Sequence, residues 1–404
     1  MRTADIDVLS CHVYADGVPH DQLAHLRRTA PVHRQDIPDP HLLDSAWVIT
    51  KAEDVRAIST RPEIFSSAQG ISLRAQRTAA AKKLDVGNFI NLDDPEHRRL
   101  RTLVGKGFTP RIVRRFEEDH RALAEGIVGR ALRLGTFDFV AEVSAELPLL
   151  AICKLLGVPE ADRALFYRWS NVLMGAEDPD YARPQAELAE IVVRFRQYVL
   201  ELVAVRRADP REDILSTLGT STLAEQDLTD DEIAGFALLL MVAGNETTRN
   251  TLSHGLIALM EHPEQWQALR ADPSLLDGAV EEIIRWASPV NYMARTVVRD
   301  TSLRGARLRE GERVALMYAS ANRDEDVIPD GDAFDITRGE QRHLSFGIGP
   351  HFCLGAHLAR GEAKAVLAEL LRRVESFHPA GPVRRLRSSF VHGIKELPVT
   401  ARLA

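Results

Sequence analysis

The sequence is poor in cysteine. Only Cys11, Cys153 and Cys353 occur among its 404 residues, and no two of them form a C-x-x-C pair. Three scattered thiols do not build a disulfide framework, and they do not supply the cysteine pairs of a structural zinc site. This usage is typical of a reducing compartment, so we expect the protein to work in the cytoplasm.

The sequence also lacks a long hydrophobic run. Its most apolar stretch, residues 237–243, is far shorter than the roughly 20 residues that cross a bilayer as a helix. The first twenty residues mix Asp, His and Arg with short apolar stretches, without the continuous apolar segment of a signal peptide. We therefore expect neither secretion nor a membrane anchor.

Positive charge is not in excess. Lys and Arg number 51 against 58 Asp and Glu, which gives a net charge of −7 and does not favour nucleic acid as a partner. Apolar residues make up 45% and charged residues 27%, the balance of a folded globular protein. Without a fixed-period repeat or a Gly/Ser-rich linker, the chain is expected to form one domain over residues 1–404.

Helical periodicity dominates the later sequence, and strand patterns are few. A capping-box spacing at Thr229 and Glu232 precedes an apolar stretch, which predicts a helix over 230–261, roughly 48 Å long. The sequence therefore predicts a mainly α fold with small peripheral β-sheets. The other expected helices cover 112–134, 140–156, 181–207, 277–286 and 357–374, and the expected strands 46–50, 295–298, 314–318 and a terminal set around Val391 and Val399.

Cys353 lies in an unusual loop. Residues 346–355 read Phe-Gly-Ile-Gly-Pro-His-Phe-Cys-Leu-Gly and lead directly into a helix-favouring run. The free N–H groups and positive dipole end of a helix start favour a thiolate, the form that ligates a metal or attacks an electrophile. A small buried hydrophobe is the ordinary role of a lone cysteine, and we assign it to Cys11 and Cys153.

This loop, Phe-Gly-x-Gly-x-His-x-Cys-x-Gly, resembles the heme-binding signature of the cytochrome P-450 family. The resemblance implies the P-450 fold, with heme b held between the long central helix and the helix that follows the cysteine loop. It makes Cys353 the iron ligand. A thiolate ligand pushes electron density onto iron and favours cleavage of the O–O bond of bound dioxygen.

A second motif lies in the middle of the long expected helix, at Ala243-Gly244-Asn245-Glu246-Thr247-Thr248. The Thr247 hydroxyl can bond back to the Ala243 carbonyl and open the regular hydrogen-bond ladder there. The motif is similar to the oxygen-binding segment of the family. On that resemblance Thr247 supports dioxygen and Glu246 relays protons, an acid–alcohol pair suited to proton delivery.

A third motif, Asp94-Pro95-Glu96-His97-Arg98-Arg99-Leu100-Arg101, reads as an N-cap followed by a basic helix. His97 and Arg101 share one face and could bind an anion, although a solvated charged helix would look the same. The resemblance assigns His97 and Arg101 to one heme propionate, and Arg295 with His351 to the other. A further group of four cations forms either a basic docking face for an acidic electron-transfer protein or an ordinary charged surface. These cations are Arg98, Arg99, Arg360 and Lys364.

Glu282 and Arg285 lie three positions apart on an expected helix and can form an ion pair. Alone this spacing is weak, but its place before the cysteine loop resembles the structural ion pair of the family. In the family a further cation completes the cluster, and the sequence leaves Arg323 and Arg338 as equal alternatives.

The resemblance also predicts the pocket and the reaction. The segments expected to form the substrate pocket include Ile71 to Phe89. Their apolar character favours a steroid, terpenoid or fatty acyl substrate. The expected reaction inserts one oxygen atom of O2, with electrons from a ferredoxin and its NAD(P)H-dependent reductase. A heme peroxygenase, which usually lacks the acid–alcohol pair, and a non-catalytic heme binding or sensor protein are the alternatives. The predicted lining comprises Leu239, Leu240, Ala243, Val290, Met293 and Val391.

Overall fold

A computed structural model describes residues 2–40, 42–74, 88–105, 108, 110–175, 177–220, 222–223, 226–339 and 342–404. Most of the expected pocket segment from Ile71 to Phe89 lies outside these residues, because 75–87 are not described. Within the described part of the chain, no helix is both long and apolar enough to cross a membrane.

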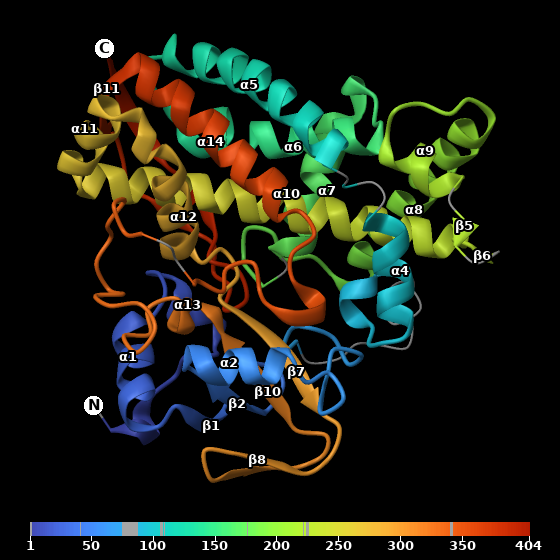
Figure 1. Ribbon diagram of the computed structural model, residues 1–404, viewed down its shortest axis with the longest axis vertical. Helices are drawn as coiled ribbons and strands as arrows, with labels where there is room; N and C mark the ends of the chain where they lie inside the picture. Colours follow the sequence, from blue (N-terminus) through green and yellow to red (C-terminus); the bar gives the residue numbers. More distant parts are fainter. Residues whose placement is uncertain are drawn as a thin grey trace.

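Helices form the larger part of the molecule, and the longest one, α10 (Asp230–Glu261), runs across it (Figure 1). The helix α10 contacts α6, α7, α8, α12 and α14, so elements distant in sequence meet along it. The predicted mainly α fold is confirmed. The other helices are α1 (His20–Thr29), α2 (Ala52–Ser59), α4 (Glu96–Gly105), α5 (Pro110–Leu132), α6 (Glu146–Leu156), α7 (Arg163–Met174), α8 (Gln185–Ala208), α9 (Ile214–Gly219), α11 (Pro263–Ala271), α12 (Leu276–Ala287), α13 (Tyr318–Ala321) and α14 (Ala356–Arg373).

The start of α10 is the predicted capping box. The Thr229 hydroxyl accepts the Glu232 N–H at 3.2 Å, and the Glu232 carboxylate accepts the Thr229 N–H at 2.9 Å. Two of the free donors at the helix end are thereby satisfied. Since α10 is packed on several sides, its apolar residues surround the axis instead of forming one stripe.

The strands form small sheets beside the helical region, as predicted. The largest has the order β1-β2-β10-β7-β3 and lies with the N-terminal segment at the lower end of Figure 1. Its central strands pair antiparallel, Arg295 opposite Val314, and Met293 and Arg295 both line the cavity described below. The strands are β1 (Val32–Asp36), β2 (Ser45–Ile49), β3 (Phe65–Ser66), β4 (Thr136–Asp138), β5 (Thr222–Leu223), β6 (Gln226–Asp227), β7 (Tyr292–Val297), β8 (Thr301–Leu303), β9 (Ala306–Leu308), β10 (Arg313–Met317), β11 (Val374–Pro379), β12 (Arg384–Arg385), β13 (Ile394–Glu396) and β14 (Pro398–Leu403).

Three expected elements differ from the structure. The helix expected over 181–207 begins only at Gln185, because Pro184 disfavours helical backbone in the residue before it. The helix expected over 140–156 divides into a π-helical turn (Val140–Ser144) and α6, where Pro148 cannot donate to the preceding turn. Val391 belongs to no strand and makes only an isolated bridge to Val290.

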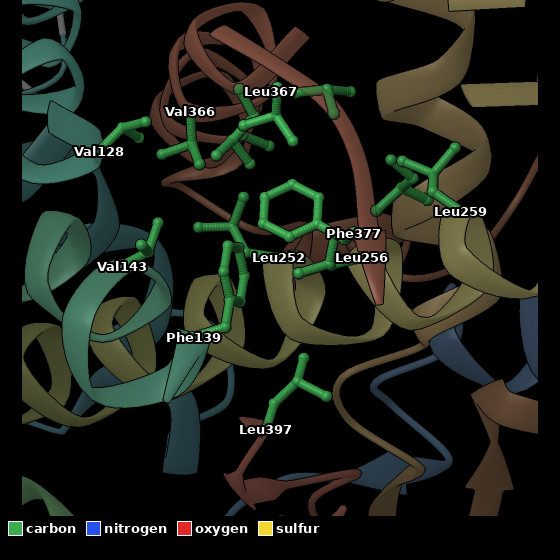
Figure 2. Close-up of a cluster of buried hydrophobic side chains, with 14 of the residues drawn as sticks. Val128, Phe139, Val143, Leu252, Leu256, Leu259, Val366, Leu367, Phe377 and Leu397 are labelled. Carbon is green, nitrogen blue, oxygen red and sulfur yellow. The ribbon is translucent and has the colours of Figure 1, made fainter. Parts of the chain in front are cut away.

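An apolar core fastens α10 to α5 and α14 (Figure 2). Leu252 and Leu256 of α10 meet Val366 of α14, all buried. Phe139 and Phe377 pack edge to face with ring centroids 6.3 Å apart. Because such interiors are close-packed, this core fixes the separation of α10 and α14, the two helices that border the site.

The expected ion pair is present at the C-terminal end of α12. Arg285 donates Nε and Nη2 to the two Glu282 oxygens, each at 2.7 Å, and neither side chain is exposed. The same guanidinium donates to the carbonyls of Asn322, Gly331 and Ala333 at 2.7 to 2.9 Å. The pair therefore ties the loop that precedes the cysteine segment to α12.

The structure distinguishes the two candidates for the third member of this cluster. Arg338 Nε lies 3.5 Å from Glu282 Oε2. Arg323 instead lies 3.4 Å from Asp332 and stacks over Trp286, 3.9 Å from the ring centroid. Arg338 thus completes the charge cluster, and Arg323 is held by a neighbouring one.

Replacing Glu282 by Gln is expected to lower the free energy of unfolding by roughly 3–5 kcal/mol, because it leaves a buried guanidinium without its counter-charge. The matched control is Glu190→Gln in the exposed Glu190–Arg194 pair of α8, expected to cost at most about 1 kcal/mol. Chemical denaturation measures both, and equal losses would contradict a dominant role for the buried pair.

Three histidines with low pKa values come from α10, the C-terminal loop and α1: His254 is buried, and His392 and His20 are partly buried. The His254 and His392 rings lie 3.6 Å apart, and His392 Nδ1 donates to the Ala287 carbonyl at 2.7 Å. Burial, with nearby arginines, lowers the pKa of His392 to about 3 and places the pKa values of His254 and His20 well below the usual range. All three are therefore neutral in the folded protein at neutral pH.

Stability is expected to fall as the pH drops from about 6.5 toward 3, because the unfolded chain binds protons there and the folded chain does not. Each histidine contributes a slope of up to roughly 1.4 kcal/mol per pH unit. In His392→Asn the amide can keep the bond to Ala287 but does not titrate, so denaturation at several pH values should give a shallower slope. His378 is exposed, so His378→Asn serves as the control. An equal change in the slope of that variant would refute the assignment of the pH dependence to His392.

Candidate active site

The cysteine loop is held in a tight conformation. Gly347 and Gly349 adopt φ of +68° and +75°, which favours glycine, and a side chain on Gly349 would lie 2.7 Å from the Ser59 carbonyl. The Cys353 N–H donates to the Phe346 carbonyl at 2.8 Å and closes the loop. The glycines expected from the sequence thus fix where the sulfur lies.

The Cys353 side chain lines the cavity and is accessible to solvent there. It precedes α14, whose N-cap residue is Gly355. Burial raises the pKa of the Cys353 thiol, while the Gly355 N–H and the charges of Arg101 and Arg360 act in the opposite direction. A cation on the sulfur would stabilise the thiolate further, because a metal ligand must be deprotonated.

The cavity measures about 230 Å³ and lies between α10, β7, the cysteine loop and α14. Its wall on the α10 side is mainly apolar. Five of the six residues predicted for the substrate pocket line it, and Val391 does not, since it is covered where it bridges Val290. The apolar part of the lining includes Ile71, Phe89, Phe236, Leu239, Leu240, Ala243, Val290 and Met293.

Thr247 brings a hydroxyl to this wall. Its Oγ donates to the Ala243 carbonyl at 2.6 Å, as predicted, and Thr247 lines the cavity. The adjacent Gly244 packs against Ile152 of α6 so closely that an added Cβ would lie 2.5 Å from Ile152 Cδ1. The middle of α10 thus has close packing against α6 on one side and a hydroxyl facing the cavity on the other.

Glu246, the other half of the expected acid–alcohol pair, does not line the cavity. It is fully buried, forms an ion pair with Arg249, and its Oε1 accepts from Asn250 at 3.1 Å. Arg249 donates in turn to Asn171 of α7 at 2.8 Å. The Glu246 Oε2 atom has no hydrogen-bond partner. The carboxylate is thus directed toward α7, one helix face away from Thr247.

The residues expected to bind an anion gather at one end of the cavity. The rings of His97 and His351 lie 4.1 Å apart, and His97 Nε2 is buried without a hydrogen-bond partner. Arg295 is buried, and its one side-chain bond among the described residues is to the Ala294 carbonyl. Arg101 donates to the Phe352 carbonyl at 2.6 Å and lines the cavity. Two guanidiniums and an unpartnered imidazole nitrogen suit carboxylate groups, so these residues fit heme propionates.

The four cations suggested for a docking face all have carboxylate partners. Arg98 pairs with Asp94 at 2.7 Å and Lys364 with Asp277 at 2.5 Å. Arg99 pairs with Glu232, and Arg360 pairs with Glu281 at 2.5 Å. Their charges are thus locally compensated.

Sequence reasoning missed several polar residues around the cavity, of which three carry titratable groups. Tyr318 and Glu362 line it, and His120 lies beside Glu362. For Glu362 a weak signal existed, because it falls among the buried positions of α14, where a carboxylate is unusual. Tyr318 and His120 carry no such signal, since each reaches the site only through the packing of its element.

The described geometry agrees with three comparisons. A family model, "Cytochrome P450", matches residues 168–396. The chain is 39% identical to the steroid C26-monooxygenase of Rhodococcus jostii, covering 97% of this chain and 84% of that protein. It is 40% identical to the methyl-branched lipid omega-hydroxylase of Mycobacterium tuberculosis, covering 98% and 95%.

Solved structures agree in fold. The cytochrome P450 CYP268A2 of Mycobacterium marinum, solved in complex with pseudoionone, has a TM-score of 0.90 and 36% identity over 98% of each chain. The match of fold and sequence extends over nearly the whole chain. This protein therefore belongs to the cytochrome P450 family, heme-iron monooxygenases, and acts on hydrophobic substrates.

Proposed function

We propose that this P450 hydroxylates a saturated carbon near the end of a branched hydrophobic chain, of the kind found in steroid side chains or methyl-branched lipids. The observation that carries the proposal is the apolar wall of α10 and β7 that faces Cys353 across the cavity. Such a wall binds a chain by burial and offers few polar groups to orient it. The two curated relatives act on substrates of these two kinds.

The proposed reaction converts R–H, O2, two protons and two electrons into R–OH and water. Heme, when bound, supplies an iron centre at which dioxygen is reduced and one oxygen atom becomes reactive toward carbon. The protein must hold that group, exclude bulk water and deliver the two protons. Its own residues are assigned below to these tasks.

Cys353 is the proposed iron ligand, because its sulfur faces the cavity from a loop closed at Phe346. His97 and Arg101 would hold one propionate of heme b, and Arg295 with His351 the other. Burial and the neighbouring Arg295 and His97 lower the pKa of His351 to about 3, so a nearby carboxylate would compensate the local positive charge.

Thr247 is the proposed hydroxyl that hands protons to dioxygen. It lies on the cavity wall, and its bond to Ala243 leaves the oxygen lone pairs free to accept from a second donor. Glu246 would recharge this route from the α7 side, where its Oε2 atom makes no hydrogen bond. Arg249 pairs with the other oxygen, Oε1, and holds the carboxylate in place.

For the electrons we propose a ferredoxin-type donor that is reduced by an NAD(P)H-dependent reductase, with the protein working in the cytoplasm. The helices α4 and α14 flank the cysteine loop and carry the paired cations described above. Because each of these charges already has a partner, they would orient a docked acidic protein more than they would attract it. The three free thiols suit a reducing compartment.

Titration of the heme-loaded protein with steroids, methyl-branched fatty acids and short terpenoids tests the substrate proposal. A ligand that enters the apolar cavity displaces water from the iron and shifts the main visible absorption band. We expect tight binding for the branched chains and weak or no binding for a straight-chain polar ligand of equal length. Preference for the polar ligand would reject the substrate class but not the family.

Thr247→Ala is expected to uncouple electron use from hydroxylation, with product per NAD(P)H falling about 10-fold and hydrogen peroxide rising, because general acid assistance contributes 10²-fold or more. The readout is the ratio of product, peroxide and NAD(P)H consumed.

The matched control is Thr29→Ala, which removes the same kind of hydroxyl-to-carbonyl bond (2.8 Å, to His25) from an exposed helix end. Unchanged coupling in Thr247→Ala, together with efficient turnover driven by peroxide alone, would favour the peroxygenase alternative. Absence of any turnover with an active donor would favour a heme sensor.

A further inference from the structure

A second, smaller cavity lies inside the apolar core that fastens α10 to α14. It measures about 20 Å³, which is enough room for one molecule of the size of water or dioxygen. Buried residues of α10, α12 and α14, together with Phe139, enclose it, and several of them are labelled in Figure 2. This smaller cavity is distinct from the larger one that contains Cys353.

The smaller cavity is chemically apolar. Among the described residues that border it, every side chain is a hydrocarbon, apart from Gly255, which has no side chain. Except for Phe139, these residues lie within helices, whose N–H and C=O groups bond to one another. A buried water needs about two to four polar partners, so water is not stabilised here. The space therefore suits a small apolar molecule.

The smaller cavity continues the larger one along the same three helices. Each of α10, α12 and α14 contributes a residue to the larger cavity and the neighbouring residue in the sequence to the smaller one. These helices also contact one another. The two cavities are therefore adjacent and share a wall. The neighbouring pairs, with the residue of the larger cavity first, are Thr251 and Leu252, Ile284 and Ile283, and Glu362 and Ala363.

Small residues leave this space between the helices. Gly255 of α10 lacks a side chain, and Ala363 of α14 has only a methyl group. Ile283 fills part of the gap, because a Cβ on Gly255 would lie 2.6 Å from Ile283 Cγ2. Close packing normally leaves few such voids in a core, and each one costs stability. A void retained beside a site that consumes a gas therefore indicates a function.

We propose that the smaller cavity holds dioxygen before it reaches the space beside Cys353. Dioxygen is small and apolar, so its transfer from water to a cavity lined by Leu252, Ile283 and Val366 is favourable. The proposal rests on the function proposed above, in which a branched chain fills the apolar part of the larger cavity. With that chain bound, a store between the helices supplies the gas across the shared wall, without passing the substrate.

Xenon is the direct probe, because it is an apolar atom that enters dry protein cavities. Crystals of the heme-loaded protein under xenon pressure should show a xenon atom between Leu252, Gly255 and Val366. Val366→Ile adds a methylene to the lining and should remove most of that xenon. Val128→Ile is the matched control, since Val128 is equally buried in the same core but does not line the smaller cavity. It should keep the xenon.

The second readout is the rate at which the reduced, heme-loaded protein takes up dioxygen, measured by stopped flow with and without a branched-chain ligand. Val366→Ile should lower this rate roughly 3-fold, most clearly with the ligand bound, because the added methylene occupies the space of the gas. Ile283→Val enlarges the space and should raise both xenon occupancy and the rate, the latter roughly 2-fold. Val128→Ile should change neither. Ala363→Val fills the cavity from another position and replaces Val366→Ile if that variant does not fold.

The outcomes separate this proposal from the function on which it rests. An ordered water in the smaller cavity, or no xenon there in the unmodified protein, overturns the proposal whatever the activity. Removal of xenon by Val366→Ile without slower dioxygen uptake shows a packing void and also refutes it. Equal slowing in Val128→Ile refutes it, because any change in the core would then act alike. If branched chains fail to bind while xenon and ligand-free dioxygen uptake respond as expected, the substrate class is wrong and the dioxygen site stands.

Discussion

The structure depends on one fully satisfied buried cation. A guanidinium has five N–H donors, and Arg285 uses all five, two on Glu282 and three on main-chain carbonyls. Burying this charge is costly unless every donor is paired, so the surrounding chain has little freedom. The carbonyls come from residues 322, 331 and 333, which fixes the long segment before the cysteine loop to α12. The position of Cys353 relative to α10 follows from this restraint and from the apolar core between α10 and α14.

Other buried polar atoms, unlike those of Arg285, have no hydrogen-bond partner. His97 Nε2, Glu362 Oε2 and both nitrogens of His120 are buried and have no hydrogen bond, whereas all five donors of Arg285 are bonded. Leaving such groups unpaired costs free energy, so they persist where a ligand or a proton transfer uses them. These atoms lie at or beside one cavity, from its anion-binding end to α14.

The helix α10 separates two kinds of chemistry by its faces. Thr247 and Thr248 face the cavity, and Glu246 with Arg249 faces α7. Glu362 of α14 and Glu246 of α10 therefore lie on different sides of this helix. In the middle of this helix Gly244 lets Ile152 pack closely, while Thr247 turns its hydroxyl to the Ala243 carbonyl.

The sequence by itself determined the mainly α fold, the bounds of α10 and the spacing of the cysteine loop. These features are local: a capping box, a periodic pattern or a run of glycines acts within a few residues. It also brought His97 and Arg101 to one helix face, and the resemblance added their expected partners Arg295 and His351.

Tertiary structure alone decided what depends on distant contacts. The choice of Arg338 over Arg323, the direction of Glu246 and the exclusion of Val391 from the cavity each follow from how separate elements pack. The same holds for the meeting of His120 with Glu362 across α5 and α14. Sequence spacing predicts which side chains share a helix face, but not which face is turned to a partner hundreds of residues away. Only close packing of the elements fixes that orientation.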